Sequence, residues 1–414
     1  MDANGAVDVV VVGAGVAGLA CALDLAAAGQ RVRLLEASDA VGGRMRTDPR
    51  DGFRLDRGFQ VFNTCYPQVR RRLDLRPLRL RPFTPGFVLA GRSGRRRLVD
   101  PTRRPGQAGD LLTGRALPAG DAAVLAALTA RDALLPAALL RRGRDVPAAA
   151  ALRRAGLSRA TLDGVLRPFL SGVFLEDELD TSSRVLHLYW RSMVRGTLAL
   201  PAAGIGAVPA ALAALLPPGA LELEAPVERV HQDGVLLADG REVGARRVVV
   251  ATEAAAAARL LPGLPVPPGR GVTTFYHAAE RSPLAEPTLL VDGDRELLNS
   301  VVLSEVVPGC APRGLSLVST SVLGTTAEER PVRARLAELY GCDTSSWEPL
   351  AAYRIPAALP AMPAPHPLTR TSRWAPGRHV CGDHRATGSV QGALASGARA
   401  AREVLADLAG GPGR

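Results

Sequence analysis

The sequence predicts an α/β fold in which a Rossmann-like domain with a parallel sheet is joined to a second, mixed α+β domain. Two observations support the first domain. A run of four valines, Val9–Val12, leads directly into a glycine-rich turn. A strand-like segment ending in Gly382-Asp383 and a small-residue segment, 389–397, follow near the other end of the chain. The length of 414 residues exceeds the usual size of one hydrophobic core, so a second domain is expected.

The N-terminal unit predicts a dinucleotide-binding site. Val9–Val12 indicates a buried parallel strand, because such a strand is covered on both faces and need not alternate. The glycines that follow allow a tight turn, close approach to a pyrophosphate and close packing of a helix, whose N-terminus offers N–H groups to the phosphates. We expect that helix over 19–28, ended by Gly29, then a strand over 31–35. An acid at its tip, Glu36, accepts ribose hydroxyls, which disfavours a 2′-phosphate and leaves NAD and FAD open. The residues expected to bind the cofactor here are Gly13, Gly15, Val16, Ala17, Gly18, Glu36 and Ala37.

The next two segments favour FAD. Residues 36–47, with Gly42-Gly43-Arg44 at their centre, resemble the extended FAD signature of the superfamily of flavin amine oxidases, protoporphyrinogen oxidases and phytoene desaturases. The resemblance implies a glutathione-reductase-type FAD-binding domain, with this turn beneath the flavin. An arginine fork also suits a diphosphate. Residues 52–60 resemble the hairpin with which that superfamily returns to the flavin. The residues implied to contact FAD are Gly43, Arg44, Gly58, Phe59 and Gln60.

The C-terminal region resembles the second flavin motif of the same superfamily. Residues 379–383 read as a short strand ending in Gly382-Asp383, and 389–397 as a helix start rich in small residues. The resemblance implies that the aspartate holds the ribityl chain and that Ser389 and Val390 face the flavin pyrimidine. A helix N-terminus there would stabilise negative charge on reduced flavin. Residues 221–230 are expected to form one strand, with Val227 against adenine.

These motifs imply a discontinuous FAD-binding domain over 1–62, 200–258 and 370–414. The substrate-binding domain is then expected at 63–199 and 259–369. The five cysteines are scattered, with no close pair, which favours a reducing compartment and excludes a flavin disulfide reductase. Because no apolar stretch is long enough to span a bilayer, we expect a cytoplasmic protein. No metal site is expected.

The charge is +11, and all 51 basic residues are arginine. The absence of lysine excludes Schiff-base chemistry and a lysine beside flavin N5, which weakens the amine oxidase interpretation. Arginines concentrate between Arg70 and Arg104 with few acids nearby in sequence. They indicate either a solvated edge around a hairpin at 87–99 or a rim that attracts an anionic substrate, an acidic partner protein or a membrane surface. No nucleic-acid motif accompanies them.

Candidate catalytic residues are few. Those placed nearest the flavin by their position after Gly382-Asp383 are His384 and Arg385. A strand at 273–277 carries Tyr276 and His277, and strands of this region often wall the substrate cavity in the superfamily. Further candidates are His187 with Arg184 and Arg191 on a helix beginning near Ser182, and the pair Tyr353 and Arg354.

The sequence therefore predicts an FAD-dependent oxidoreductase of the oxidase or desaturase type, which moves hydride from a substrate C–H to flavin N5. The substrate is expected to be small and largely apolar or cyclic, and O₂ or another acceptor reoxidises the flavin. A flavin-dependent isomerase, an NADPH-dependent monooxygenase and a binding protein like the Rab dissociation inhibitors remain alternatives. The sequence determines neither the oligomeric state nor the substrate.

Overall fold

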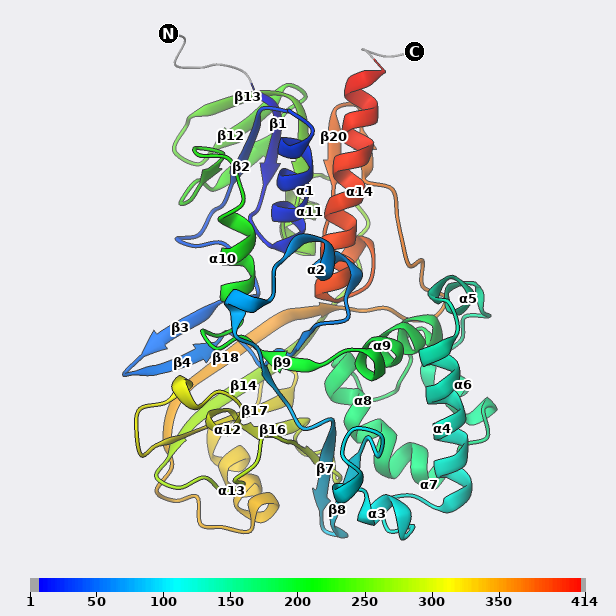
Figure 1. The fold of residues 1–414 in the computed structure, drawn as a ribbon. Coiled ribbons are helices and arrows are strands. Elements are labelled where there is room, and N and C mark those ends of the chain that lie inside the picture. The colour runs from blue at the N-terminus through cyan, green and yellow to red at the C-terminus, as the bar shows by residue number, and fades with distance from the viewer. Residues whose placement is uncertain (1–6, 411–414) are drawn as a thin grey trace.

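The computed structural model describes residues 7–410 (Figure 1). Two β-sheets organise this part of the chain, one near the two ends and one in the opposite half of the molecule (Figure 1). The first sheet draws its strands from residues 7–35, 221–250 and 373–380. The second draws its strands from 86–99, 269–323 and 348–360. The α/β class with a mixed second unit is confirmed. The predicted domain boundaries stay a prediction, and their ends at 1–6 and 411–414 lie outside the described residues.

The first sheet has the parallel centre that the valine run predicted. β1 pairs in parallel with β2 on one side and with β13 on the other, and β10 and β20 extend the parallel part outward. β11, β12 and β19 pair in an antiparallel manner with their neighbours. The strands are β1 (Val7–Val12), β2 (Val32–Leu35), β10 (Leu221–Glu222), β11 (Val227–Val230), β12 (Gly234–Leu237), β13 (Glu242–Val250), β19 (Arg373–Ala375) and β20 (Arg378–Val380).

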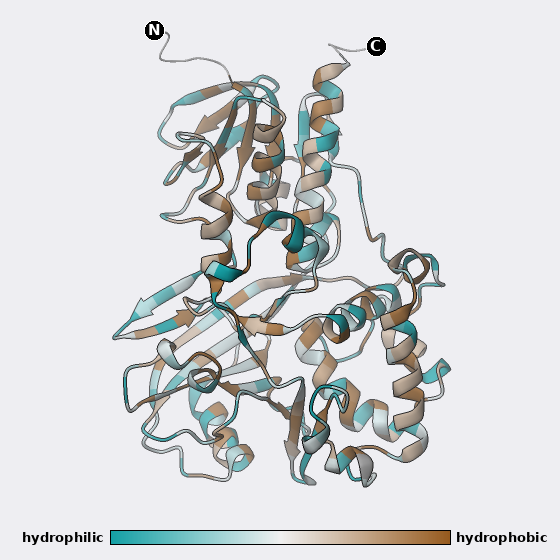
Figure 2. Ribbon diagram, in the orientation of Figure 1, coloured by the Kyte–Doolittle hydropathy of each residue, from teal (hydrophilic) through white to brown (hydrophobic). Residues whose placement is uncertain are grey.

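Both faces of β1 are covered, which explains why its sequence does not alternate between apolar and polar. Val9 and Val11 pack under α1 and α14, whereas Val10 and Val12 face the ribbon of β11–β13. Figure 2 shows this part of β1 and α1 as apolar ribbon. The helices around the sheet are α1 (Val16–Ala27), α2 (Pro67–Arg72), α10 (Ala207–Ala213), α11 (Ala254–Leu260) and α14 (Val390–Ala409).

Two local predictions need correction. The helix expected over 19–28 begins earlier, at Val16, because the chain enters helical geometry directly after the N-cap Gly15. The single strand expected over 221–230 is wrong, since β10 and β11 are separated by a turn. Glu224 there has a φ of 52°, and Pro226 cannot donate a backbone hydrogen bond to a ladder. The turn lets the chain pair first with β2 and then with β12.

The second sheet has the order β18–β14–β17–β16–β15–β7–β8 and is antiparallel except for the parallel pair β15–β7. The predicted hairpin at 87–99 is confirmed as β7 and β8. Tyr276 of β14 faces the β3–β4 hairpin, whereas Phe275 packs under α13 on the other face. The strands are β7 (Gly86–Gly91), β8 (Gly94–Val99), β14 (Gly269–Ala279), β15 (Leu289–Asp292), β16 (Asn299–Val302), β17 (Ser316–Leu323) and β18 (Glu348–Pro360).

Short ladders and a helical layer complete the fold. The ladders are β3 (Thr47–Arg50) with β4 (Phe53–Asp56), and β5 (Phe62–Asn63) and β6 (Arg81–Pro82) on either side of β9 (Leu198–Leu200). The remaining helices are α3 (Gly109–Leu112), α4 (Ala119–Leu134), α5 (Ala137–Arg142), α6 (Ala148–Arg154), α7 (Arg159–Thr161), α8 (Arg167–Phe174), α9 (Ser183–Arg195), α12 (Leu303–Val306) and α13 (Glu329–Tyr340). Ser182 caps α9 by accepting a hydrogen bond from the Val185 N–H, as its sequence predicted.

Candidate functional site

A cavity of about 1040 Å³ extends from the carboxyl ends of β1, β2 and β13 to the second sheet and the helical layer. Ligands of open α/β sheets bind at this edge, where the chain leaves neighbouring strands in opposite directions. The cavity is lined by every residue predicted to bind the cofactor except Gly18. These lining residues are Gly13, Gly15, Val16, Ala17, Glu36, Ala37, Gly43, Arg44, Gly58, Phe59, Gln60, Val227, Gly382, Asp383, Ser389 and Val390.

The glycine loop between β1 and α1 places backbone against the cavity. Gly13 has a φ of 101°, which only glycine adopts without strain, and its carbonyl oxygen lies where a side chain at Gly18 would stand. Gly18 therefore serves the contact between helix and loop rather than the cavity. Gly15 caps α1 without a side chain, so the first N–H groups of this helix receive no side-chain partner. Such N–H groups and the positive end of the helix dipole attract an anion.

Glu36 at the end of β2 is held against the glycine loop. Its Oε2 accepts a hydrogen bond from the Ala14 N–H at 2.6 Å, and its Oε1 accepts one from the Ser38 N–H at 3.0 Å. The carboxylate is largely buried but still borders the cavity. Because each carboxylate oxygen has two lone pairs, both oxygens retain acceptor capacity for hydroxyl groups of a ligand.

The two motifs from opposite ends of the chain meet at one ion pair. Arg44 Nη2 lies 2.7 Å from Asp383 Oδ2, and Arg44 Nη1 donates to the carbonyl oxygen of Ala358 at 2.8 Å. Gln60 Nε2 donates to the carbonyl oxygen of Arg44 at 2.6 Å. The guanidinium is about one-third exposed and the carboxylate is nearly buried. Because part of its guanidinium group remains exposed beside the cavity, Arg44 can also donate hydrogen bonds to a phosphate.

The start of α14 forms the wall opposite the glycine loop. The Ser389 hydroxyl caps the helix by accepting from the Gly392 N–H at 3.0 Å, and Val390 lies on the cavity surface. Tyr189 of α9 donates its hydroxyl hydrogen to the carbonyl oxygen of Gly388 at 2.7 Å, which fixes the loop before the helix. The predicted helix start is thus present and borders the cavity.

His384 and Arg385 follow Asp383 but do not line the cavity. Because Gly382 has a φ of 148°, the chain turns back and the His384 ring occupies the space that a Cβ at Gly382 would need. Both ring nitrogens of His384 are buried without a hydrogen-bond partner in the described structure, and burial lowers the pKa of the ring to about 4. Arg385 Nη2 donates to the carbonyl oxygen of Thr371. Their catalytic roles stay predictions.

Tyr276 and His277 lie on opposite faces of β14 and neither lines the cavity. The Tyr276 hydroxyl donates to the carbonyl oxygen of Asp56 at 2.8 Å, below the hairpin. His277 Nε2 lies 3.1 Å from Glu329 Oε1 of α13, and burial lowers the pKa of its ring. The residue of this strand that does reach the cavity is Val272. The structure therefore gives Tyr276 and His277 packing contacts, and their catalytic roles remain untested.

The further candidates also have partners away from the cavity. His187 Nδ1 lies 2.8 Å from Asp132 Oδ2 of α4, and Arg191 of the same helix donates to carbonyl oxygens at the end of α4. The opposite face of α9, with Tyr189 and Met193, borders the cavity instead. Tyr353 donates to Asp48 Oδ2 at 2.8 Å, and Arg354 donates to a carbonyl oxygen beyond β17.

The wall from the second sheet and the helical layer carries no charged residue. Among the described lining residues, the charged ones belong to the dinucleotide motifs, to the segments 228 and 253–259, or to Arg57 directly after the β3–β4 hairpin. Burial raises the pKa of Tyr66 to about 12 and holds that of Tyr189 well above its usual value, so both hydroxyls stay protonated near neutral pH. The uncharged wall is formed by Val61, Asn63, Tyr66, Phe169, Gly172, Val173, Leu175, Tyr189, Met193, Leu198, Val272, Leu289, Val291, Leu298, Asn299, Ser321, Ile355, Ala358, Leu359 and Gly388.

Sequence reasoning missed nearly all of this wall. Its residues lie singly on strands and helices that also carry ordinary core side chains, so no motif marks them. The apolar face of α9 could have indicated Tyr189 and Met193 through its helical period, but such a stripe is also the pattern of a core helix.

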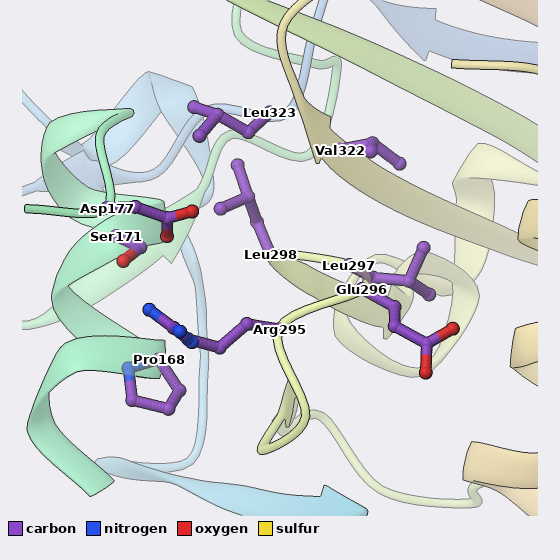
Figure 3. A pocket seen from close by; sticks show the side chains of 9 residues that line it. All are labelled: Pro168, Ser171, Asp177, Arg295, Glu296, Leu297, Leu298, Val322 and Leu323. Carbon is purple, nitrogen blue, oxygen red and sulfur yellow. The ribbon is translucent and has the colours of Figure 1, made fainter. Parts of the chain in front are cut away.

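A smaller pocket of about 180 Å³ adjoins the cavity and shares Leu298 with it (Figure 3). Arg295, Glu296 and Asp177 line this pocket, so it is polar where the cavity wall is apolar. Within residues 7–410, no group of three or more metal-ligating side chains comes together. The helices in the same part of the chain are each too short or too polar to cross a bilayer.

Comparisons with known proteins agree with the arrangement of these motifs. The sequence profile of the family described as "Flavin containing amine oxidoreductase" matches residues 16–405. The L-amino-acid oxidase of Bungarus fasciatus is 60% identical over 52 residues, which are 12% of this chain and 10% of the relative. The hydroxyneurosporene desaturase of Rhodobacter capsulatus is 43% identical over 81 residues, 17% of this chain and 16% of the relative. The matched segments therefore span a small part of these curated relatives.

A solved structure shares the fold along nearly all of this chain. An oxidoreductase from Methanosarcina mazei superposes with a TM-score of 0.70 at 17% sequence identity, over 96% of this chain and 100% of that one. At this identity the likeness establishes the fold and not the substrate.

Proposed function

The chain belongs to the family of flavin-containing amine oxidoreductases and is an FAD-dependent oxidoreductase, and on this premise we propose that it oxidises an uncharged, largely apolar substrate in the 1040 Å³ cavity. The observation that carries the proposal is the contrast between the two halves of that cavity. The dinucleotide motifs bring carboxylates and guanidinium groups to one end. The wall from the second sheet and the helical layer brings none.

The residues at the charged end fit FAD. The loop after β1 exposes backbone N–H groups at the start of α1, where a diphosphate would be favoured. Glu36 retains acceptor capacity for ribose hydroxyls. Arg44 and Asp383 would contact the phosphates and the ribityl chain, as the superfamily resemblance implies, and α14 begins at the same cavity. These residues would hold FAD, and bound FAD would accept a hydride from a substrate C–H and pass the electrons to O₂ or another acceptor.

The uncharged wall supports the substrate class. A substrate with an ammonium and a carboxylate would lose its hydration against this wall and find no counter-charge, at a cost of several kcal/mol for each ion. An apolar chain or ring would instead release water from a surface of similar character. Of the two relatives, one is named for an amino acid and the other for a hydroxylated neurosporene. The wall favours a substrate of the second kind.

The protein's own share of the chemistry is binding, orientation and exclusion of water. Tyr189 holds the loop before α14 through Gly388, and Gln60 holds the hairpin through the carbonyl oxygen of Arg44. The apolar wall keeps water away from the reacting carbon and so protects the hydride transfer. Since Tyr66 and Tyr189 remain protonated, neither acts as a base at neutral pH.

The test is anaerobic reduction of the purified holoprotein. Flavin absorbance is followed while one compound of each class is added: an apolar polyene, a cyclic amine and an amino acid. We expect bleaching with the polyene or with the uncharged form of the cyclic amine, and none with the amino acid. Bleaching by the amino acid alone would refute the proposed substrate class. Bleaching only by NADPH would indicate a monooxygenase, and conversion of the polyene without bleaching an isomerase. A protein that cannot be loaded with FAD would overturn the proposal altogether.

Asn299 provides a matched pair of variants on the apolar wall. It lies on β16 with its Oδ1 buried and unpaired in the described structure. Asn299→Asp places a charge in that wall and should lower the second-order rate constant of flavin reduction by about 100-fold, since an unpaired buried carboxylate costs several kcal/mol. Asn299→Leu keeps the branching and the number of side-chain heavy atoms without the charge and should stay within about tenfold of wild type. Equal effects of the two changes would contradict the role assigned to the uncharged wall.

A further inference from the structure

The end of α4 and the following helix α5 lie at an outer corner of the helical layer (Figure 1). We call residues 131–144 the α4–α5 corner. Leu134 is 79% exposed and Leu139 is 51% exposed, and Pro136 and Ala138 are exposed between them. No other large apolar side chain among the described residues is as exposed as Leu134. An exposed apolar patch rimmed by polar residues can mark an interaction site.

The exposed charged side chains of the α4–α5 corner are all positive. The corner carries four arginines, Arg131, Arg141, Arg142 and Arg144, and a single acid, Asp132. Asp132 is buried and engaged with Arg131 and His187. In the described part of the chain the side chains of Arg141, Arg142 and Arg144 form no ion pair, and all three are exposed. The corner thus presents leucines within a cationic collar.

The arginines between 70 and 104 differ in this respect. Several of them bind acids that lie far away in the sequence: Arg72 binds Asp24, and Arg97 binds Glu286. Few acids lie near this region in the sequence, but folding brings distant acids to it. Its capacity to attract an acidic surface is correspondingly reduced.

The corner is held in place and is not a frayed helix end. Arg191 of α9 donates to the carbonyl oxygens of Asp132, Ala133 and Leu135 at 2.7, 2.8 and 2.6 Å. Arg195 also donates to the carbonyl oxygen of Ala133. These donors satisfy carbonyl groups that the end of α4 leaves without helical partners. The exposed leucines accordingly point outward from a fixed backbone.

We propose that the α4–α5 corner docks the enzyme on an anionic lipid surface, with Leu134 and Leu139 inserted among the acyl chains and the arginines at the headgroups. A rigid apolar tip surrounded by cations is complementary to such a surface. A second copy of this chain is a poorer occupant. A twofold contact would place the same arginines against one another.

Docking at this corner would bring the cavity close to the membrane. The same helix α9 that holds the corner through Arg191 presents Tyr189 and Met193 to the cavity on its other face. An apolar substrate partitions into lipid, so an enzyme docked there would meet it at high local concentration. This link to the substrate rests on the proposed function, whereas the docking itself rests on the corner alone.

The experiment is co-sedimentation of the full-length holoprotein with vesicles of phosphatidylcholine alone or with phosphatidylserine added. Wild type should bind the anionic vesicles and not the neutral ones. The double change Leu134→Ser and Leu139→Ser should reduce the partition coefficient at least about tenfold, because each buried leucine contributes strongly. Changing Arg141, Arg142 and Arg144 to Gln should reduce it about fivefold per arginine. Leu215→Ser, an exposed leucine after α10, is the matched control and should change nothing.

The outcomes separate the docking proposal from the proposed function. Failure of wild type to bind anionic vesicles, or serine variants that bind like wild type, would overturn the docking. Serine variants that change the oligomeric state but not vesicle binding would assign the corner to a second copy and also overturn it. Flavin reduction by a dispersed apolar compound is measured on the same samples. Reduction without vesicle binding refutes only the docking, and vesicle binding without reduction refutes only the proposed substrate class.

Discussion

The glycine loop allows the fold and cofactor binding to be separated by two substitutions only three residues apart. Gly15 has a φ of −67° and a ψ of 171°, a conformation that any residue adopts, and a Cβ there meets no atom within 4 Å. Gly15→Ala should therefore leave the apoprotein as stable as wild type, or more stable by about 0.4–1 kcal/mol, because alanine restricts the unfolded chain.

The same methyl group would stand where the loop faces the cavity. We expect it to push a diphosphate away from the N–H groups of the loop and of α1. Hydrogen bonds to a charged group contribute about 1.5–3 kcal/mol. Losing one of them raises the Kd for FAD about 10- to 150-fold.

Gly18→Ala should behave in the opposite way. Its Cβ would overlap the carbonyl oxygen of Gly13 and lie 3.2 Å from the Cβ of Ala251. Neither the loop nor β13 can move without disturbing the centre of the first sheet, so the overlap should cost about 1–3 kcal/mol in the free energy of unfolding, even without FAD.

Two measurements on the apoproteins test whether Gly15 serves cofactor binding and Gly18 serves the stability of the fold. Urea unfolding gives the free energy of unfolding, and quenching of flavin fluorescence during titration gives the Kd for FAD. The reasoning would be refuted by a Gly15→Ala apoprotein that loses as much stability as Gly18→Ala. A Gly15→Ala protein with wild-type affinity for FAD would refute it equally.

Two further predictions concern buried charge. Burial raises the pKa of Asp56 to about 6, above its unfolded value, so its carboxyl stabilises the fold most below pH 4 and progressively less as pH rises through 6. The unfolding free energy of Asp56→Asn relative to wild type should thus rise by up to about 3 kcal/mol between pH 4 and pH 7, and a difference independent of pH would contradict this. Arg335 of α13 pairs with the fully buried Asp292 at 2.6 Å, so Arg335→Leu should cost about 3–5 kcal/mol in urea unfolding. Adding Asp292→Asn should recover part of that loss, and strict additivity of the two changes would exclude the pairing as its cause.

The sequence by itself determined the dinucleotide-binding loop of this protein and the acid beside it. A tight turn, a close approach of helix to loop and an acid at a strand tip are local requirements, so a few residue types at fixed spacing reveal them. Gly13, Gly18 and Glu36 could be assigned in this way, and the structure places them in one loop and at the strand beside it. The second flavin motif was recognised by its resemblance to the superfamily, which placed Ser389 at a helix start, and the structure shows this residue capping α14.

Only the tertiary structure decided which side chains form the rest of the cavity beyond the cofactor-binding motifs. The cavity wall takes one or two residues from each of many segments, and those residues are apolar in the same way as their neighbours in the core. The direction of His384 depends on one backbone angle at Gly382, and the neutralisation of Arg97 depends on Glu286, a residue far along the chain. Orientation and long-range pairing arise when the whole chain packs. Local spacing therefore predicted a dinucleotide site and the family resemblance predicted FAD, whereas the uncharged cavity wall and the exposed α4–α5 corner could be read only after folding had brought distant segments together.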